Sequence, residues 1–117
     1  MISILTGICS AEHTMPRAID LIIRQTYKNW RLIICEGGST DDSYRIVKKY
    51  AAEDSWTIAF RNKRNHGQGY MLNRCFDRSS GALIARMDEY DISLPYRLEK
   101  ERDFLMVNPD FAAVSWR

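Results

Sequence analysis

The sequence has few cysteines, little net charge and no long hydrophobic run, and each of these shortages excludes a class of protein. Its 3 cysteines are an odd number without a C-x-x-C pair, which argues against a disulfide framework and against a zinc site. The net charge of +2 is too small to indicate binding to nucleic acid. No apolar run approaches the roughly 18 residues of a membrane span, and MISILTGICS lacks the basic segment of a signal peptide. We therefore expect a cytoplasmic protein in a reducing compartment.

The composition is that of an ordinary globular domain. Of the 117 residues, 45% are hydrophobic and 27% are charged, so a disordered chain is not expected. A chain of this length buries roughly two thirds of its unfolded surface. There is no repeat, low-complexity tract or linker. We predict a single domain covering residues 1–117.

Short apolar, β-branched runs alternate with amphipathic segments along the chain. We expect strands at Ile2–Ile8 and at residues 30–35, 56–60, 83–87 and 111–115. We expect helices after an N-cap at Thr14, after an N-cap at Thr40 or Asp41, at residues 67–79 with Gly81 as terminator, and at residues 95–107. This alternation predicts an α/β fold: a mostly parallel, open, Rossmann-like sheet with helices on both faces.

The helical periodicity also predicts which side chains face the sheet. In the first helix these are Met15, Ala18, Ile19, Ile22 and Ile23. In the second they are Ile46, Val47, Tyr50 and Ala51, and in the third Leu72, Cys75 and Phe76.

Ligands of open parallel sheets bind at the carboxyl ends of the strands. The segments that matter are therefore 7–13, 36–42, 61–67 and 88–93. The chain stops after its last expected strand without a closing helix. We interpret it as a fragment of a larger protein, or as a sheet whose open edge is completed by a partner, for example in a homodimer.

Three carboxylates follow the expected fourth strand: Asp88, Glu89 and Asp91. Clustered carboxylates at a strand end suit a hard divalent cation such as Mg²⁺ or Mn²⁺. The alternative is that they favour the positive end of the following helix. Spacing alone leaves both open.

The stretch ICEGGSTDDS at residues 34–43 is the second candidate. A carboxylate at a strand end can accept hydrogen bonds from a base or a ribose, and glycines let the backbone approach a ligand. The alternative is ordinary helix capping by Ser, Thr and Asp. The basic segment RNKRNH at 61–66 is either a surface loop or a contact for phosphate. Both histidines, His13 and His66, are expected at the surface.

A dinucleotide fingerprint is not supported. Gly67-Gln68-Gly69 begins like one, but Leu72 stands where the third glycine belongs, and the segment follows the third strand rather than the first. We therefore do not expect a Rossmann oxidoreductase.

Taken in order, several segments resemble the family 2 glycosyltransferases with the A-type nucleotide-sugar fold. They are QTYKNW, GSTDDS, N-x-G in NHGQGYMLN, ARMD, and DISLP-x-RLEK. The resemblance covers nearly the whole chain. It implies binding of a nucleoside diphosphate sugar with Mn²⁺ or Mg²⁺, and inverting transfer of the sugar to a hydroxyl acceptor, sugar or lipid-linked, by a carboxylate base. It also implies a role in cell-surface polysaccharide or glycan synthesis, at the inner face of the membrane.

The resemblance can be carried over residue by residue. The family's Pro-x-Tyr-Asn loop appears as Gly7-Ile8-Cys9-Ser10, and its Asp-Asp-Gly-Ser as Glu36-Gly37-Gly38-Ser39. Its Asp-x-Asp motif matches at Asp88, while Tyr90 replaces the second aspartate. The implied nucleotide-sugar residues are Gly7, Ser10, Glu12, Glu36, Gly38, Asn65, Gly67, Asn73, Arg86 and Asp88, and the implied metal ligands are Asp88, Asp91 and Glu89.

The departures from the family pattern fall on positions that face the ligand. Nothing in the sequence can be assigned as the catalytic base, so the isolated chain is expected to be inactive in transfer. The alternative is a degenerate, non-catalytic relative that serves as a binding or interaction module.

Overall fold

The computed structural model describes residues 2–10, 12–26, 28–62, 67–79, 83–86 and 97–107. It contains four parallel strands, β1 (Ile2–Ile8), β2 (Trp30–Glu36), β3 (Thr57–Arg61) and β4 (Leu83–Arg86). Their order across the sheet is β3-β2-β1-β4. Within the described ranges, the predicted parallel sheet is confirmed. The fifth expected strand, at 111–115, lies outside these ranges.

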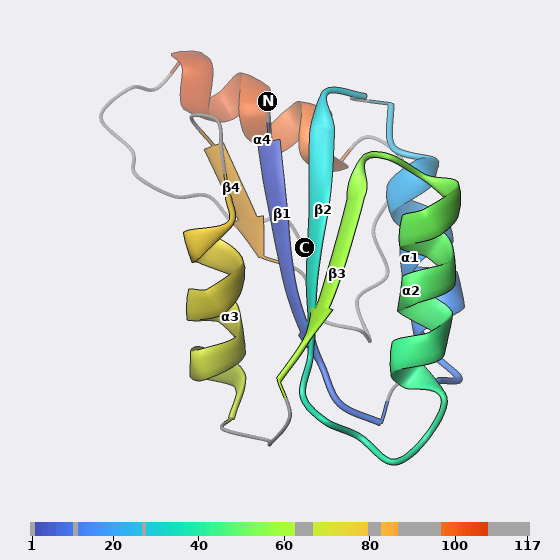
Figure 1. Ribbon diagram of the computed structural model, residues 1–117. Coiled ribbons are helices and arrows are strands. Elements are labelled where there is room, and N and C mark those ends of the chain that lie inside the picture. The colour runs from blue at the N-terminus through green and yellow to red at the C-terminus, as the bar shows by residue number, and fades with distance from the viewer. Residues whose placement is uncertain are drawn as a thin grey trace.

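The register brings three strand ends into one row. Ile8 of β1 pairs with Glu36 of β2, and Glu36 pairs with Arg61 of β3. Each of these residues is the last of its strand. The loops that follow β1, β2 and β3 therefore leave the sheet side by side, at the lower edge in Figure 1.

Helices cover both faces of the sheet, as predicted. Figure 1 shows α1 (Met15–Ile23) and α2 (Ser43–Glu53) on one side of the strands and α3 (Gln68–Asp77) on the other. The fourth helix, α4 (Arg97–Val107), is held at its start by the turn after α1, where the Leu98 N–H donates to Gln25 Oε1 at 3.0 Å. No helix in the described ranges is long and apolar enough to cross a membrane.

Two cores result, because successive side chains of a strand point to opposite faces. The larger core lies between the sheet and the helices α1, α2 and α4, and consists of Ile2, Ile4, Ile8, Met15, Ala18, Ile19, Ile22, Trp30, Leu32, Ile34, Val47 and Leu98. The smaller core lies under α3 and consists of Leu5, Ile33, Cys35, Met71 and Cys75. Both faces of β1 and β2 are thus buried, which explains their nearly continuous apolar sequences.

Two predicted core residues are not in the core. Ile23 is 41% exposed and Phe76 is 57% exposed, whereas Met71, which the periodicity did not single out, is 3% exposed. Ile23 and Phe76 both lie at the edge of their helix's apolar stripe, where one further rotation step turns a side chain to solvent. The predictions of these two residues as core were wrong.

Several boundaries also differ from expectation. Helix α2 begins at Ser43 with Asp42 as N-cap, later than an N-cap at Thr40 or Asp41 would give. Helix α3 ends at Asp77, before Gly81 is reached. Strand β3 begins at Thr57, which leaves Trp56 in the preceding turn.

Candidate functional site

Glu36, the last residue of β2, is completely buried at the carboxyl edge of the sheet. Its carboxylate accepts hydrogen bonds from the Gly38 N–H at 2.9 Å, from the Ser39 N–H at 2.7 Å and from the Ser39 hydroxyl. It also forms an ion pair with Arg61, whose Nε lies 2.9 Å from Oε2. The carboxylate therefore holds its own loop together and keeps few sites for any other donor.

Arg61, the last residue of β3, completes this arrangement. Its Nη2 donates to the Ser39 carbonyl at 2.7 Å, and its guanidinium lies 5.1 Å from the centre of the Tyr44 ring. Arg61 thus ties the loop after β2 to the strand end beside it and to the start of α2. We call Glu36, Ser39 and Arg61 the loop lock.

The sequence analysis missed the role of Arg61, which it placed in the segment RNKRNH as either a surface loop or a phosphate contact. A usable signal was present. A carboxylate that directly follows the apolar run at residues 32–35 must find a cation when it is buried. Arg61 is the first basic residue after an apolar strand that can lie next to β2.

Two glycines, Gly37 and Gly38, follow Glu36 in the chain, and each position requires glycine for a different reason. A Cβ on Gly37 would lie 2.9 Å from Met71 Sδ and 3.3 Å from the Ile8 carbonyl oxygen. Gly38 has a φ of 82°, a backbone conformation that residues with a Cβ rarely adopt. The Gly37 N–H also donates to the Ile8 carbonyl at 2.8 Å, so this loop lies directly against the end of β1 and the first turns of α3.

The loop after β1 is tied to the start of α2 by reciprocal contacts. The Asp42 N–H donates to Glu12 Oε2 at 3.2 Å, and the Glu12 N–H donates to Asp41 Oδ2 at 3.4 Å. The other Asp41 oxygen accepts from the N–H of Ser43 at 3.0 Å and from its hydroxyl at 2.5 Å. The side-chain hydrogen bond from Ser43, with further backbone hydrogen bonds, lowers the pKa of Asp41.

The backbone of Ser10 is strained, and this residue lies at the carboxyl edge of the sheet. Its φ is 54°, and no other non-glycine residue in the described ranges has a positive φ. Residues held in the left-handed region cluster at ligand sites, where the surrounding structure maintains them. Gly67, with a φ of 90°, is the N-cap of α3 and is exposed.

Asn62 and Arg74 form a second polar contact next to the loop lock. Asn62 is 3% exposed, its N–H donates to the Glu36 carbonyl at 2.8 Å, and its Oδ1 accepts from Arg74 Nη1. The Arg74 guanidinium also lies 4.9 Å from the centre of the Phe60 ring. The polar contact links the end of β3 to the middle of α3.

The structure brings some of the predicted site residues together and separates others. Ser10, Glu12 and Gly38 lie on the loops after β1 and β2, Glu36 ends β2, and Gly67 is the N-cap of α3 at the same edge (Figure 1). Gly7 is buried within β1, Asn73 is exposed on α3, and Arg86 ends β4 opposite Leu5. Four predicted residues lie outside the described ranges: Asn65, Asp88, Glu89 and Asp91. His13 is exposed as expected, with 93% of its side-chain surface accessible.

The predicted metal ligands all follow β4 in sequence, so the metal site remains a prediction. Among the residues that the structure describes, no group of three His, Cys, Asp or Glu side chains could hold an ion. The strand order reverses between β1 and β4, and open α/β sheets bind ligands in the crevice at such a reversal. Ser10 follows β1, one of the two strands at this reversal, and Arg86 is the last residue of β4, the other.

Comparison with known proteins identifies the family. The family model described as "Glycosyl transferase family 2" matches residues 3–117. EpsE of Bacillus subtilis (strain 168), which carries the name of a glycosyltransferase, is 44% identical over 105 residues, covering 89% of this chain and 38% of EpsE. The Escherichia coli protein WfgD, named as a UDP-Glc:alpha-D-GlcNAc-diphosphoundecaprenol beta-1,3-glucosyltransferase, is 30% identical over 92% of this chain and 42% of its own length. The chain thus spans about two fifths of these relatives.

Solved structures share the fold. TarS of S. aureus, residues 1–349 in complex with UDP-GlcNAc, superposes with a TM-score of 0.83 at 17% identity, covering 91% of this chain and 31% of that one. The mannosyltransferase PcManGT from Pyrobaculum calidifontis, in complex with GDP-Man and Mn²⁺, gives 0.80 at 17% identity, covering 89% and 32%. The resemblance drawn from the sequence motifs is confirmed, and the chain belongs to glycosyl transferase family 2.

Proposed function

We propose that this chain is the donor-binding part of a glycosyltransferase and binds a nucleoside diphosphate sugar at the carboxyl edge of its sheet. The observation that carries the proposal is the loop lock. Glu36, Ser39 and Arg61 fix the loop after β2 against the ends of β1 and β3, beside the reversal of strand order. Family membership and the nucleotide sugars bound by the TarS and PcManGT structures support the choice of ligand.

In this proposal Glu36 acts by positioning the loop and does not contact the nucleotide. Its oxygens are taken by Gly38, Ser39 and Arg61. The donor would instead meet the exposed surface of the same loops, at Ser10 and Gly38, and the N-terminal end of α3 at Gly67. A helix N-terminus offers unpaired N–H groups and a positive dipole end, which suit a diphosphate.

Asp88, Glu89 and Asp91 would hold Mn²⁺ or Mg²⁺, because a set of carboxylate oxygens next to a diphosphate suits these hard cations. When bound, the cation supplies Lewis-acid stabilisation of the charge that develops on the diphosphate leaving group. The Mn²⁺ in the PcManGT structure supports this choice of cation.

The finer assignments are part of the proposal, and the name of one relative supports the choice of reaction. WfgD is named for transfer of glucose from UDP-glucose to a diphosphoundecaprenol-linked sugar. We infer an inverting transfer to a hydroxyl acceptor in polysaccharide synthesis, at the inner face of the membrane. The base that takes the acceptor proton is not assigned to a residue of this chain.

A titration of the chain with UDP and GDP in the presence of Mn²⁺ tests donor binding. We expect saturable binding that needs Mn²⁺ and is lost in Asp88→Ala. Asp77→Ala is the matched control, because it removes an exposed carboxylate at the far end of α3 and should bind like the wild type. No binding of either nucleotide by the folded wild type would refute the proposal.

One observation favours a second candidate, a non-catalytic binding or interaction module. Gly37 stands where the family pattern has its second aspartate, and Met71 and the Ile8 carbonyl occupy the space that a side chain would need. Self-association through an open sheet edge is the interaction we would test first, by gel filtration with light scattering. A monomer at high concentration, together with nucleotide binding, would exclude this alternative.

A further inference from the structure

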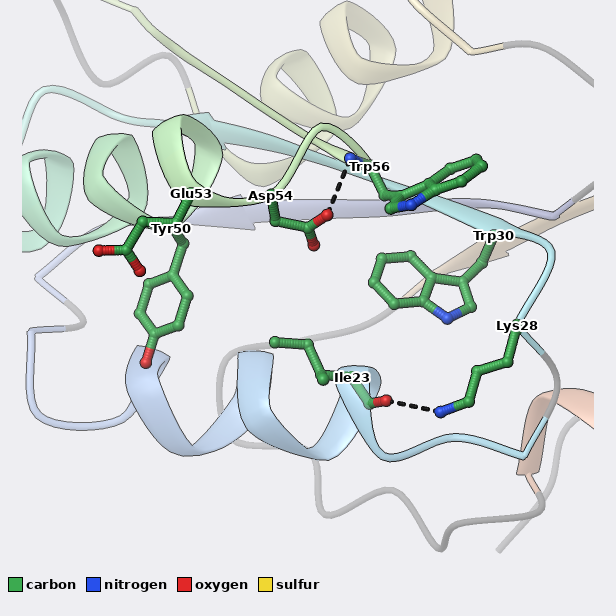
Figure 2. A pocket seen from close by; sticks show the side chains of 7 residues that line it. All are labelled: Ile23, Lys28, Trp30, Tyr50, Glu53, Asp54 and Trp56. Carbon is green, nitrogen blue, oxygen red and sulfur yellow. Dashed lines mark hydrogen bonds between the residues drawn. The ribbon is translucent and has the colours of Figure 1, made fainter.

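A groove of about 530 Å³ lies at the opposite edge of the sheet from the candidate donor site. Its lining consists of Ile23, Lys28, Trp30, Tyr50, Glu53, Asp54 and Trp56 (Figure 2). Trp30 is the first residue of β2 and Trp56 directly precedes β3, so the groove lies at the amino ends of the strands. Donor binding at the carboxyl ends makes no use of it.

The groove presents an unusual amount of aromatic surface. Trp56 is 50% exposed, Tyr50 is half-buried and Trp30 is 5% exposed. Ile23, at the end of α1, adds aliphatic surface and is 41% exposed. Exposed tryptophan next to a second indole is typical of a surface that takes a partly apolar ligand.

The polar groups of the groove include one unmatched donor. Trp30 Nε1 is buried, and it has no hydrogen-bond partner among the residues that the structure describes. Figure 2 shows this nitrogen on the side of the indole ring that is turned toward Ile23 and Lys28. A buried donor left unpaired is unfavourable, so a ligand oxygen that accepts a hydrogen bond from it would gain affinity. Lys28 is an exposed lining residue with a long rotatable side chain on the side of the indole that carries this nitrogen (Figure 2), so a ligand oxygen would reach Nε1 by displacing that side chain.

The charges around the groove select the ligand. Lys28, whose Nζ donates to the Ile23 carbonyl at 2.9 Å, opposes binding of a cation. Glu53 and Asp54 oppose binding of an anion. Asp54 is already used by the Trp56 N–H at 3.0 Å and by the Thr57 hydroxyl at 3.2 Å, while no hydrogen bond of the Glu53 carboxylate is seen in the described ranges.

A neutral ring with one apolar face and hydroxyls of both donor and acceptor character satisfies all of these groups. We propose that the groove binds a hexopyranose unit of a saccharide, stacked on Trp56 and accepting a hydrogen bond from Trp30 Nε1, with Glu53 and Lys28 as polar contacts. Burial and the nearby carboxylates of Asp20 and Glu53 raise the pKa of Tyr50, so its hydroxyl also stays a neutral hydrogen-bonding group. The site is separate from the donor site and does not depend on nucleotide binding.

The test is an NMR titration of the indole N–H resonances of the chain with methyl glycosides of glucose, galactose, mannose and N-acetylglucosamine, and with maltotriose. We expect at least one of these saccharides to shift the Trp30 and Trp56 resonances saturably. Trp56→Ala should weaken its binding about tenfold or more, because stacking surface is lost. Phe76→Ala is the matched control: Phe76 is similarly exposed but lies on α3, on the other face of the sheet, and its removal should change nothing.

Two further variants identify the contacts. Trp30→Phe keeps an aromatic ring and removes the unmatched donor, so we expect severalfold weaker binding in a protein with an unchanged circular dichroism spectrum. Glu53→Gln keeps a hydrogen-bonding group without the charge, so saccharide binding should persist. Tetramethylammonium serves as the cationic probe, and its binding in place of saccharides would overturn the proposal.

The proposed saccharide site would also be overturned if no saccharide, at up to about 50 mM, shifted the indole N–H resonances saturably. Saccharide binding that survives Trp56→Ala unchanged would overturn it as well. Nucleotide binding measured on the same Trp56→Ala sample should equal that of the wild type, which separates failure at this groove from failure at the donor site.

Discussion

At the scale of single residues, Glu36 shows how a buried carboxylate can shape a loop. A charge removed from water must recover its lost hydration from fixed donors. Glu36 does this with two backbone N–H groups, a hydroxyl and a guanidinium, and all of these belong to segments that must converge at one edge of the sheet. The charge therefore specifies one arrangement of the loop, because other arrangements would leave it unpaired.

Removal of Arg61 should destabilise the protein. Breaking a buried ion pair costs about 3–5 kcal/mol, but the Arg61 side chain is 39% exposed and three other donors remain on Glu36, so we expect Arg61→Ala to lower the free energy of unfolding by about 1–2 kcal/mol. Urea denaturation followed by circular dichroism measures this. Arg45→Ala removes an exposed ion pair with Asp42 and should change it by less than about 0.5 kcal/mol. Equal losses in the two variants would mean that burial of Glu36 contributes nothing.

Ser10 offers the opposite kind of prediction, a substitution that stabilises. A left-handed backbone costs a residue with a Cβ about 1–2 kcal/mol, and glycine avoids most of this cost. We expect Ser10→Gly to raise the free energy of unfolding by about 0.5–1 kcal/mol. Ser55→Gly, in a turn without positive φ, should lower it or leave it unchanged. A loss of stability in Ser10→Gly would show that the serine side chain holds the loop.

At the scale of elements, one of the contacts that position α3 joins its first turns to the loop after β2. Met71 fills the space beside Gly37, and Cys75, one turn further on, packs with it against Leu5 and Ile33. A Cβ at residue 37 and the present position of Met71 exclude each other. The candidate site and the packing of α3 are therefore coupled through a single glycine.

A pair of glycine substitutions tests this coupling. Gly37→Ala should lower the free energy of unfolding by about 1–2 kcal/mol, because the new methyl group meets Met71 Sδ and the Ile8 carbonyl. Gly69→Ala, where a Cβ meets nothing within 4 Å and the residue lies in α3, should raise it by up to about 1 kcal/mol. In a Met71→Ala background the effect of Gly37→Ala should shrink, and strictly additive effects would contradict the coupling.

The elements themselves were predictable because local periodicity decides them. β1 and β2 are buried on both faces, and α1 carries its apolar residues at helical spacing, so their types follow from sequence alone. The position of Ile23 and Phe76 could not be predicted, because a residue at the edge of an apolar stripe is turned in or out by tertiary packing. The pairing of Glu36 with Arg61 depends on the register between β2 and β3, which periodicity does not give. The metal ligands proposed after β4 stay a prediction.

At the scale of the whole molecule, the two edges of the sheet have opposite characters. The carboxyl edge is built from glycines, hydroxyls and paired charges, which hold loops close to a polar ligand. The amino edge carries two indoles and a phenol in a shallow groove. This contrast fits the two proposals, a donor nucleotide at the first edge and a saccharide at the second.

We expect the whole fold to unfold in one cooperative transition, and the reactivity of two buried cysteines can test this expectation. Cys35 and Cys75 are fully buried between the sheet and α3, and burial raises the pKa of both thiols, that of Cys75 to about 12. At pH 8 the Cys75 thiolate is therefore a fraction on the order of 10⁻⁴, and neither thiol is accessible to reagent. Cys35 belongs to β2, and Cys75 packs with Leu5 and Ile33 of β1 and β2, the two strands that contribute side chains to both cores, so we expect α3 to unfold together with the sheet.

In a Cys9→Ser variant, which removes the half-buried third thiol, we expect a thiol reagent at pH 8 to leave the native protein unmodified. Labelling should then increase with urea in parallel with the loss of the circular dichroism signal, since both report the same cooperative transition. Mass spectrometry assigns the modified cysteine at each urea concentration. Labelling of Cys75 while the helical signal is still complete would contradict a single transition, and would show that α3 detaches from the sheet first and takes the Met71 contact of the loop after β2 with it.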